Sequence, residues 1–124
     1  MSDFDILVGH IEDCLDFERL LRDVRAVLGV DLREMPPGSR RFWGELGDHR
    51  IYVNDEFAVN GIDDPAEPYK SHPYEVIVDA VDDAEGRTLA NLLYDTLKRS
   101  GDYRLILLEE GAFVGSTHFP EKEW

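Results

Sequence analysis

Apolar residues recur along this chain at two different spacings, and each spacing predicts a type of element. In one stretch they return every three or four positions with charged residues between them, which is typical of an amphipathic helix. We predict that this helix begins near Asp13 or Asp16, either of which is suited to cap it, and ends at Gly29. Its apolar face consists of Phe17, Leu20, Leu21, Val24, Val27 and Leu28.

A second helix is predicted over residues 82–100. Asp82 and Glu85 fit an acidic variant of the capping box at its start, and Gly101 is suited to end it. The residues predicted to form its apolar stripe, which should pack on a sheet, are Leu89, Leu92, Leu93, Thr96 and Leu97.

Alternation of apolar and polar residues predicts strands in much of the remaining chain. Two such runs lie on either side of Gly47-Asp48, a dipeptide that suits the two-residue turn of a hairpin. The sequences YEVIVDAV, YRLILLEE and AFVGSTHF predict three more strands. Residues 4–11 fit either a short first strand or the first turns of a longer helix, and the pattern does not decide between them.

The order of these elements predicts a single α+β domain over residues 1–124, a length that suits one domain. We expect a mostly antiparallel sheet of about five or six strands with two amphipathic helices packed on one face, in a ferredoxin-like element order with additions. Residues 60–73 contain three prolines and several acids, so they are expected to form an irregular acidic surface loop.

Charge is unevenly distributed along the chain, and it narrows the range of partners. The formal net charge is −14, and residues 54–85 contain ten acids against the single base Lys70. A field of this sign repels nucleic acid and anionic membranes, so we expect neither as a direct partner. No apolar run approaches the length of a membrane span, and the first residues do not fit a signal peptide. The expected location is the cytoplasm.

No motif in the sequence predicts catalysis, a metal or a cofactor. The four histidines are far apart and Cys14 is the single cysteine, so no short motif supplies even two zinc ligands. Glu109 and Glu110 are neighbours on a predicted strand and point to opposite faces, so they are not expected to act as an acid–base pair. Phosphate-binding glycine loops and nucleophile motifs are absent. We therefore predict a non-catalytic protein without metal or cofactor.

The acidic segment is the best candidate for a functional surface. A concentrated negative field attracts a basic protein and accelerates its association. Tyr69 lies among acids in the proline-bounded loop, which is the makeup of an aromatic anchor for a cationic partner. The predicted partner-binding residues are Asp55, Glu56, Asp63, Asp64, Glu67 and Tyr69.

The chain resembles the bacterial immunity proteins, which neutralise a cognate toxin by covering its active site. The resemblance lies in its small size, in the acidity of NDEFAVNGIDDPAEPYK and DAVDDAEG, and in the absence of catalytic motifs. It implies a basic protein partner such as a toxin or nuclease. Two other classes stay open: a structural or regulatory domain of a larger bacterial assembly, and a small enzyme or small-molecule binder without a recognisable motif.

Overall fold

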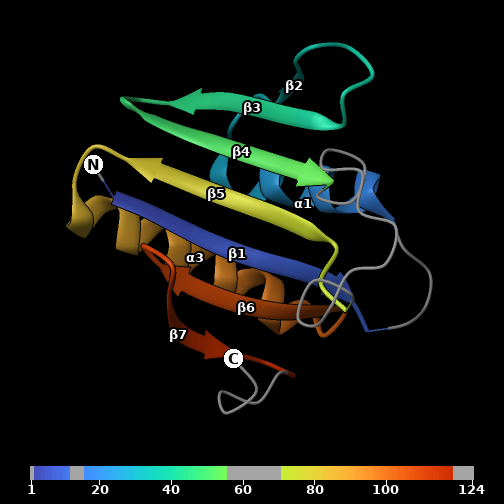
Figure 1. Cartoon of the computed structure of the whole chain (residues 1–124), viewed down its shortest axis with the longest axis vertical. Helices are drawn as coiled ribbons and strands as arrows, with labels where there is room; N and C mark the ends of the chain where they lie inside the picture. The colour runs from blue at the N-terminus through green and yellow to red at the C-terminus, as the bar shows by residue number, and fades with distance from the viewer. Residues whose placement is uncertain (1, 12–15, 56–70, 119–124) are drawn as a thin grey trace.

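The computed structural model describes residues 2–11, 16–55 and 71–118, and the chain is drawn in Figure 1. The elements of this described part are, in chain order, β1 (Ser2–His10), α1 (Phe17–Leu28), β2 (Arg33–Glu34), β3 (Arg41–Leu46), β4 (His49–Asp55), β5 (Tyr74–Ala80), α3 (Asp83–Ser100), β6 (Tyr103–Glu109) and β7 (Ala112–Ser116). The first segment is therefore a strand, which answers the question that its sequence pattern left open.

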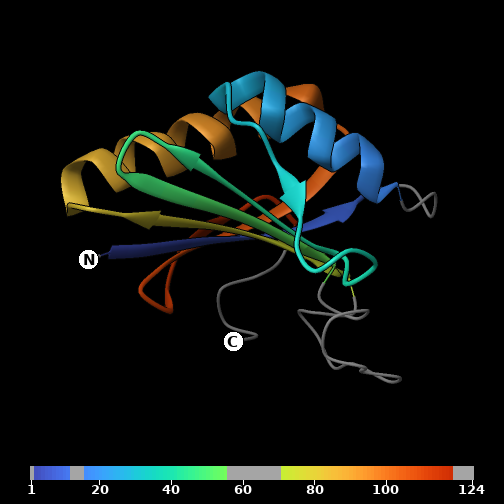
Figure 2. The ribbon, with the colours of Figure 1, turned by 90° about the horizontal axis from the view of Figure 1, so that it is seen from above.

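The strands form one antiparallel sheet with the order β2-β3-β4-β5-β1-β6-β7. Both helices cover the same face of this sheet, as Figure 2 shows. The predicted α+β class, with one antiparallel sheet and two helices, is confirmed. The sheet has seven strands where five or six were predicted, because Arg33–Glu34 pairs with β3 at one edge. The ferredoxin-like order is not fully confirmed, since β2 and β3 extend one edge and β7 extends the other.

The main core lies between the helices and the sheet, because alternate apolar residues of the strands point toward the helices. Phe4, Ile6 and Val8 of β1 do so, and none of them is more than 2% exposed. The same alternation on β5 buries Tyr74, Val76, Val78 and Ala80. Complete burial of a large apolar side chain contributes about 1.5–3 kcal/mol to folding, so this layer holds the sheet and helices together.

Helix α1 begins and ends as its sequence predicts. The Asp16 side chain accepts a hydrogen bond from the Arg19 backbone N–H at 3.1 Å, and Gly29 ends the helix in the left-handed conformation with φ of 66°. The cap at Asp16 satisfies an N–H group that has no partner inside the helix, and glycine adopts positive φ without strain. Neither helix of the described part is long and apolar enough to cross a membrane.

Helix α3 has the predicted bounds and packs on the sheet through Leu93 and Leu97 of the predicted stripe, but its buried face is turned toward the small residues. Its buried residues are Gly86, Ala90, Leu93, Tyr94 and Leu97, whereas Leu92, predicted to lie in the apolar stripe, is 48% exposed. Gly86 explains the orientation, because a Cβ atom at this position would lie 2.6 Å from both the Phe4 ring and the Ala80 Cβ. The small residues thus let the helix approach the sheet closely, and Leu92 is turned outward.

Candidate docking surface on the open face of the sheet

The sheet face opposite the helices, which we call the open face, carries side chains in three cross-strand rows. Strand register defines the first row as Glu45, Arg50, Asp79 and Asp3. The second row consists of Trp43, Tyr52, Ile77, Asp5, Leu108 and Phe113. The third row consists of Arg41, Asn54, Glu75, Leu7, Ile106 and Ser116.

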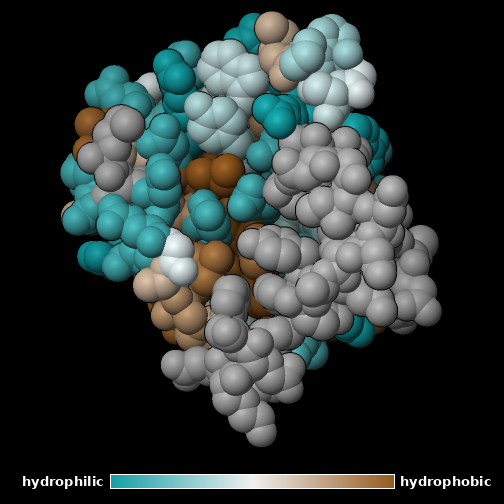
Figure 3. All heavy atoms as spheres, in the orientation of Figure 1, coloured by the Kyte–Doolittle hydropathy of each residue, from teal (hydrophilic) through white to brown (hydrophobic). Residues whose placement is uncertain are grey.

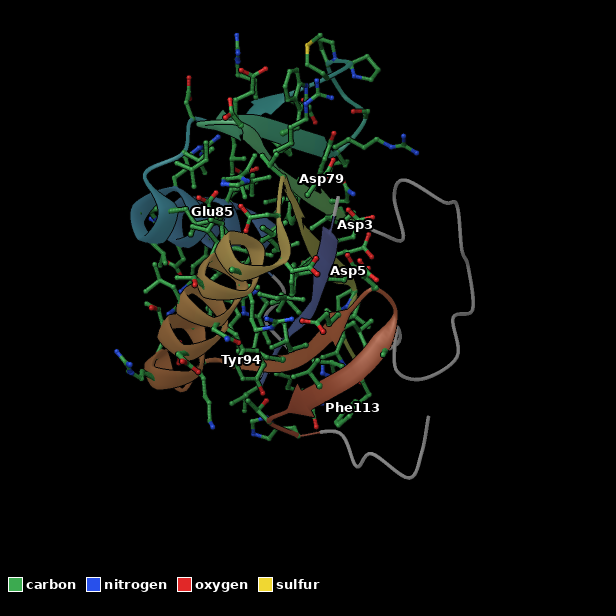
Figure 4. The ribbon with its side chains drawn as sticks, turned by 90° about the vertical axis from the view of Figure 1, so that its left-hand side faces the viewer. Asp3, Asp5, Asp79, Glu85, Tyr94 and Phe113 are labelled. Carbon is green, nitrogen blue, oxygen red and sulfur yellow. The ribbon has the colours of Figure 1, made fainter. Side chains whose placement is uncertain are left out.

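The two middle strands of these rows, β5 and β1, place four carboxylates on the open face. We call Asp3, Asp5, Glu75 and Asp79 the central carboxylates. Neither strand contains a lysine or an arginine, and Arg50 and Arg41 lie one and two strands away from β5. Figure 4 shows Asp3, Asp5 and Asp79 on the side of the sheet opposite Glu85 of α3. The centre of the open face is therefore negative, and its cations lie on the surrounding strands.

Asp3 and Asp79 are the closest pair within this group. They are direct cross-strand partners, a position at which like charges destabilise a sheet. Burial, the charge of Asp79 and a side-chain hydrogen bond with Asp79 together raise the pKa of Asp3 above its ordinary value. Oδ1 of Asp79 is buried and has no hydrogen-bond partner among the described residues. A cation beside the pair would relieve the like-charge contact.

Arg50 is the cation closest to this pair in the strand register, yet it is directed elsewhere. Its guanidinium lies 6.0 Å from the centre of the Trp43 ring, and a hydrogen bond with the Tyr52 side chain is the main reason why its pKa lies above the ordinary value. No ion pair within 4.0 Å joins Arg50 to Asp79, although the two residues are opposite each other on β4 and β5. The charge of Asp79 still contributes to the raised pKa of Arg50, and Asp79 forms its side-chain hydrogen bond with Asp3.

Aromatic and aliphatic side chains lie beside the carboxylates. Trp43 and Tyr52 are half-buried cross-strand neighbours on β3 and β4. Beyond them, Leu7, Ile106 and Leu108 are buried in a second, smaller apolar cluster on this face, with Phe113 packed against it. Figure 3 shows apolar atoms near the centre of the open face, with hydrophilic atoms to their left and above them. Aromatic anchors next to charged groups are typical of protein-binding surfaces.

A second concave feature lies on the helix side, between α3 and the β3–β4 hairpin. This pocket of about 350 Å³ is lined by Leu46, His49, Ala84, Glu85, Thr88 and Leu89. Nδ1 of His49 accepts a hydrogen bond from the Val81 N–H at 3.1 Å, so a neutral ring carries its proton on Nε2, which lies 2.7 Å from Glu85 Oε2. Both ring nitrogens are occupied by protein groups. The pocket is therefore better suited to binding than to proton transfer.

The same contact modifies the predicted start of α3. Asp82 caps the helix as expected, since its side chain accepts a hydrogen bond from the Glu85 N–H at 2.8 Å. The reciprocal half of a capping box would need the Glu85 carboxylate to turn back toward the Asp82 N–H. That carboxylate pairs with His49 instead, so it ties the helix to the β3–β4 hairpin.

Only one of the six predicted partner-binding residues, Asp55, lies in the described part. Its carboxylate accepts hydrogen bonds from Arg40 Nη2 at 2.9 Å and Nε at 3.2 Å, and its side chain is 16% exposed. The Arg40 guanidinium also lies 4.7 Å from the centre of the Phe17 ring, so this pair connects β4 to α1. The residues that lie outside the described part, and whose role stays a prediction, are Glu56, Asp63, Asp64, Glu67 and Tyr69.

The central carboxylates were not among the predicted site residues. The sequence does contain a signal for each pair, because Asp3 and Asp5 alternate with apolar residues, as do Glu75 and Asp79. Alternation places each pair on the polar side of its own strand. It does not reveal that β1 and β5 are neighbours. Only the pairing of these two strands brings Asp3 and Asp5 to the same part of the sheet as Glu75 and Asp79.

Comparisons of this chain with protein-family models, with curated proteins and with solved structures found no match. A function is therefore inferred from the chain's own residues. Among the described residues, no group of three or more His, Cys, Asp or Glu side chains is placed to hold a metal ion. The strongest feature is the open face, with its negative centre and adjacent aromatic residues.

Proposed function

We propose that this protein is a non-catalytic binding protein of the cytoplasm that docks on a basic protein, in the manner of an immunity or inhibitor protein acting on a toxin or nuclease. The docking surface consists of the central carboxylates together with the predicted acidic residues of segment 56–70, which connects β4 to β5.

The central carboxylates are the observation that carries this proposal. Asp3 and Asp79 are direct partners on the two adjacent strands, and like charges in this position repel each other. The four central carboxylates lie outside the core formed by the helices and the sheet. A basic partner would replace this repulsion by attraction. The net charge of −14 would also accelerate the encounter by factors of roughly 10 to 1,000 at low salt. Nucleases fit this requirement, since their sites carry cations for phosphate.

Association kinetics with a purified partner test the proposal. A protein captured from the native host would be purified and its binding measured at two ionic strengths. The face variant combines Asp3→Asn, Asp5→Asn, Glu75→Gln and Asp79→Asn. The control variant removes the same number of charges elsewhere through Glu18→Gln, Asp31→Asn, Asp83→Asn and Asp95→Asn, all at exposed positions. We expect the face variant to associate about tenfold or more slowly and with a weaker salt dependence, and the control variant to change much less.

Two results would contradict the proposal. Equal effects of the two variants would mean that net charge alone, and not the open face, governs association. A captured partner that is acidic, or whose association does not depend on salt, would exclude electrostatic docking altogether. As an independent check on the surface, Trp43→Ala should raise the dissociation rate because it removes a half-buried aromatic anchor, with little effect on the association rate.

Small-molecule binding is the second candidate function, and the pocket beside His49 favours it. Its volume of about 350 Å³ lies at the lower end of the range for ligand pockets, roughly 300–1,000 Å³. A screen of small apolar compounds by thermal unfolding would test it. Compounds that stabilise the wild type but not Leu89→Trp, which fills the pocket, would support this function, and an absence of stabilising compounds would count against it.

A further inference from the structure

The open face carries opposite charges on two adjacent halves. The half formed by β2, β3 and β4 carries three arginines, since Arg33 is the cross-strand partner of Trp43 on this face, Arg41 lies on β3 and Arg50 lies on β4. The other half, formed by β5 and β1, carries the central carboxylates and contains no lysine or arginine. Figure 1 shows the two halves side by side in one sheet, with β4 next to β5 at the boundary.

The three arginines are exposed, and their charges are not consumed by ion pairs within the chain. Among the described residues, none of the three forms an ion pair within 4.0 Å with a carboxylate. Arg50 lies directly across from Asp79, but a hydrogen bond with Tyr52 is the main reason for its raised pKa, and the charge of Asp79 contributes less. The arginines can therefore also interact with carboxylates of a second molecule.

Half-buried side chains with large apolar parts lie between the two charged halves. Trp43, Tyr52 and Ile77 follow one another across β3, β4 and β5 in the middle row of the open face, and each is half-buried. The row continues to a cation at Arg33 on one side and to an anion at Asp5 on the other. A less polar centre with charged groups around it is typical of protein–protein interfaces.

A twofold axis parallel to the strands makes a face of this kind complementary to itself. Rotation about such an axis near β4 and β5 lays the arginine half of one copy on the carboxylate half of the other, and symmetry repeats the contact in the opposite sense. The middle rows of the two copies then meet at the centre. Sheets that pack face to face commonly keep their strands nearly aligned. A twofold axis across the strands would instead place carboxylates on carboxylates, so the charges select the first arrangement.

We propose that two copies of this protein associate through their open faces as a twofold dimer, in which Arg33, Arg41 and Arg50 of each copy face the central carboxylates of the other. This inference goes beyond the proposed docking function and adds a form of regulation to it. The dimer covers the surface that would bind a basic partner, so self-association and partner binding exclude each other. Two copies that each carry a net charge of −14 repel at long range, so the dimer is weak and forms at high protein concentration.

Sedimentation equilibrium of charge-reversed variants tests the dimer. The arginine variant combines Arg33→Glu and Arg41→Glu, and the carboxylate variant combines Asp3→Lys and Asp5→Lys. Each variant alone places like charges on both halves, so we expect its dimer dissociation constant to rise at least about tenfold above that of the wild type. An equimolar mixture of the two variants should form a heterodimer, because each reversed charge then faces a charge of opposite sign.

The control variant combines Arg22→Glu and Arg99→Glu, two exposed helix positions outside the open face. It has the same net charge as the arginine variant and should weaken self-association much less. The arginine variant changes exposed residues only, so its comparison with the control still decides the question if the carboxylate variant does not fold. A wild type that stays monomeric up to about 1 mM, or equal effects of the arginine and control variants, would overturn the dimer. Two folded variants that do not associate when mixed would also overturn it.

Partner kinetics separate this inference from the docking function. If the wild type is monomeric but a basic partner binds with the expected salt dependence, the dimer is excluded and docking stands. If the dimer forms and no basic partner binds, docking fails and the dimer stands. If both form, a basic partner should dissociate the dimer, and a complex that contains two copies joined through their open faces together with the partner would contradict their mutual exclusion.

Discussion

Asp3 and Glu34 are both carboxylates near a strand end, yet their surroundings change their pKa values in opposite directions. Burial and the neighbouring Asp79 raise the pKa of Asp3 above 3.8. Hydrogen bonds from the backbone N–H groups of Gly38 and Arg40, at 2.9 and 3.0 Å, lower the pKa of Glu34 below 4.5. A carboxylate that accepts backbone hydrogen bonds favours its charged form, whereas one beside a like charge favours its protonated form. Asp3 is thus the group whose charge opposes folding.

Asp3→Asn should stabilise the protein at pH 7. The pKa of Asp3 is raised in the folded state, so folding favours the protonated carboxyl. Its contribution to the free energy of unfolding is therefore present below pH 3.8 and is lost as pH rises through the folded-state pKa. Asparagine removes the like-charge contact with Asp79, so we expect the free energy of unfolding at pH 7 to rise by less than about 1 kcal/mol. The gain should shrink as pH falls toward 3.8, which urea unfolding at several pH values would measure.

Asp31→Asn is the matched control for this measurement, since it removes one exposed carboxylate at a position outside the open face. The difference between the two variants isolates the Asp3–Asp79 contact from the general effect of lowering the net charge. An Asp3→Asn protein that is less stable than the wild type at pH 7 would show that the contact between Asp3 and Asp79 does not destabilise the folded protein.

At the scale of the element, α3 shows how one small residue sets the orientation of a helix. Gly86 allows close approach to Phe4 and Ala80, and Ala90 is buried on the same face of the helix. Leu93 has an exposed fraction of 0%, whereas Leu92, one position earlier, is 48% exposed. Both residues are leucines of the same helix, so the same substitution can be compared at a buried and at an exposed position.

Leu93→Ala should lower the free energy of unfolding by about 2–5 kcal/mol, because it leaves a cavity in a packed core. Leu92→Ala should change it by less than about 0.5 kcal/mol, as expected for an exposed helix position. Chemical denaturation of both variants measures the difference. Similar losses for the two variants would contradict the orientation of α3, and a loss confined to Leu92→Ala would reverse it.

At the scale of the whole molecule, the distribution of charge is the dominant property. The open face adds a negative centre to the acidic segment that the sequence identifies, and both belong to a chain with a net charge of −14. Replacing Asp63, Asp64 and Glu67 by Asn, Asn and Gln should leave the stability unchanged or raise it slightly, because like-charge repulsion falls. Association with the basic partner should become slower and less dependent on salt.

Tyr69→Ala provides the complement to this triple variant. An aromatic anchor forms its contacts after the two proteins have met, and it stabilises the bound complex. Its removal should therefore raise the dissociation rate and leave the salt dependence of association unchanged. Stopped-flow measurements at two ionic strengths separate the two effects. A triple variant that associates as fast as the wild type, with the same salt slope, would restrict docking to the central carboxylates or exclude it.

Sequence patterns predicted the elements of this protein well where the pattern is local. The caps at Asp16 and Asp82, the left-handed glycines at positions 29 and 101, and the two-residue turn at Gly47-Asp48 depend on residues within one turn of one another. The buried face of α3 was predicted less well, because the leucine stripe competes with the small residues Gly86 and Ala90 for the sheet. Periodicity alone cannot decide which of these two sets of residues packs on the sheet. The choice depends on which side chains of the sheet lie opposite the helix.

The sequence by itself determined the α+β class, the alternation that turns one side of each strand toward the core, and the large negative charge. Tertiary structure alone decided that β1 and β5 lie side by side, which sets Asp3 against Asp79 although the two residues are distant in the chain. It also decided that Arg50 forms a hydrogen bond with Tyr52, and that none of the described residues forms a hydrogen bond with the buried Oδ1 of Asp79. The physical reason is that alternation fixes which way a side chain points, whereas strand order and register fix what it meets.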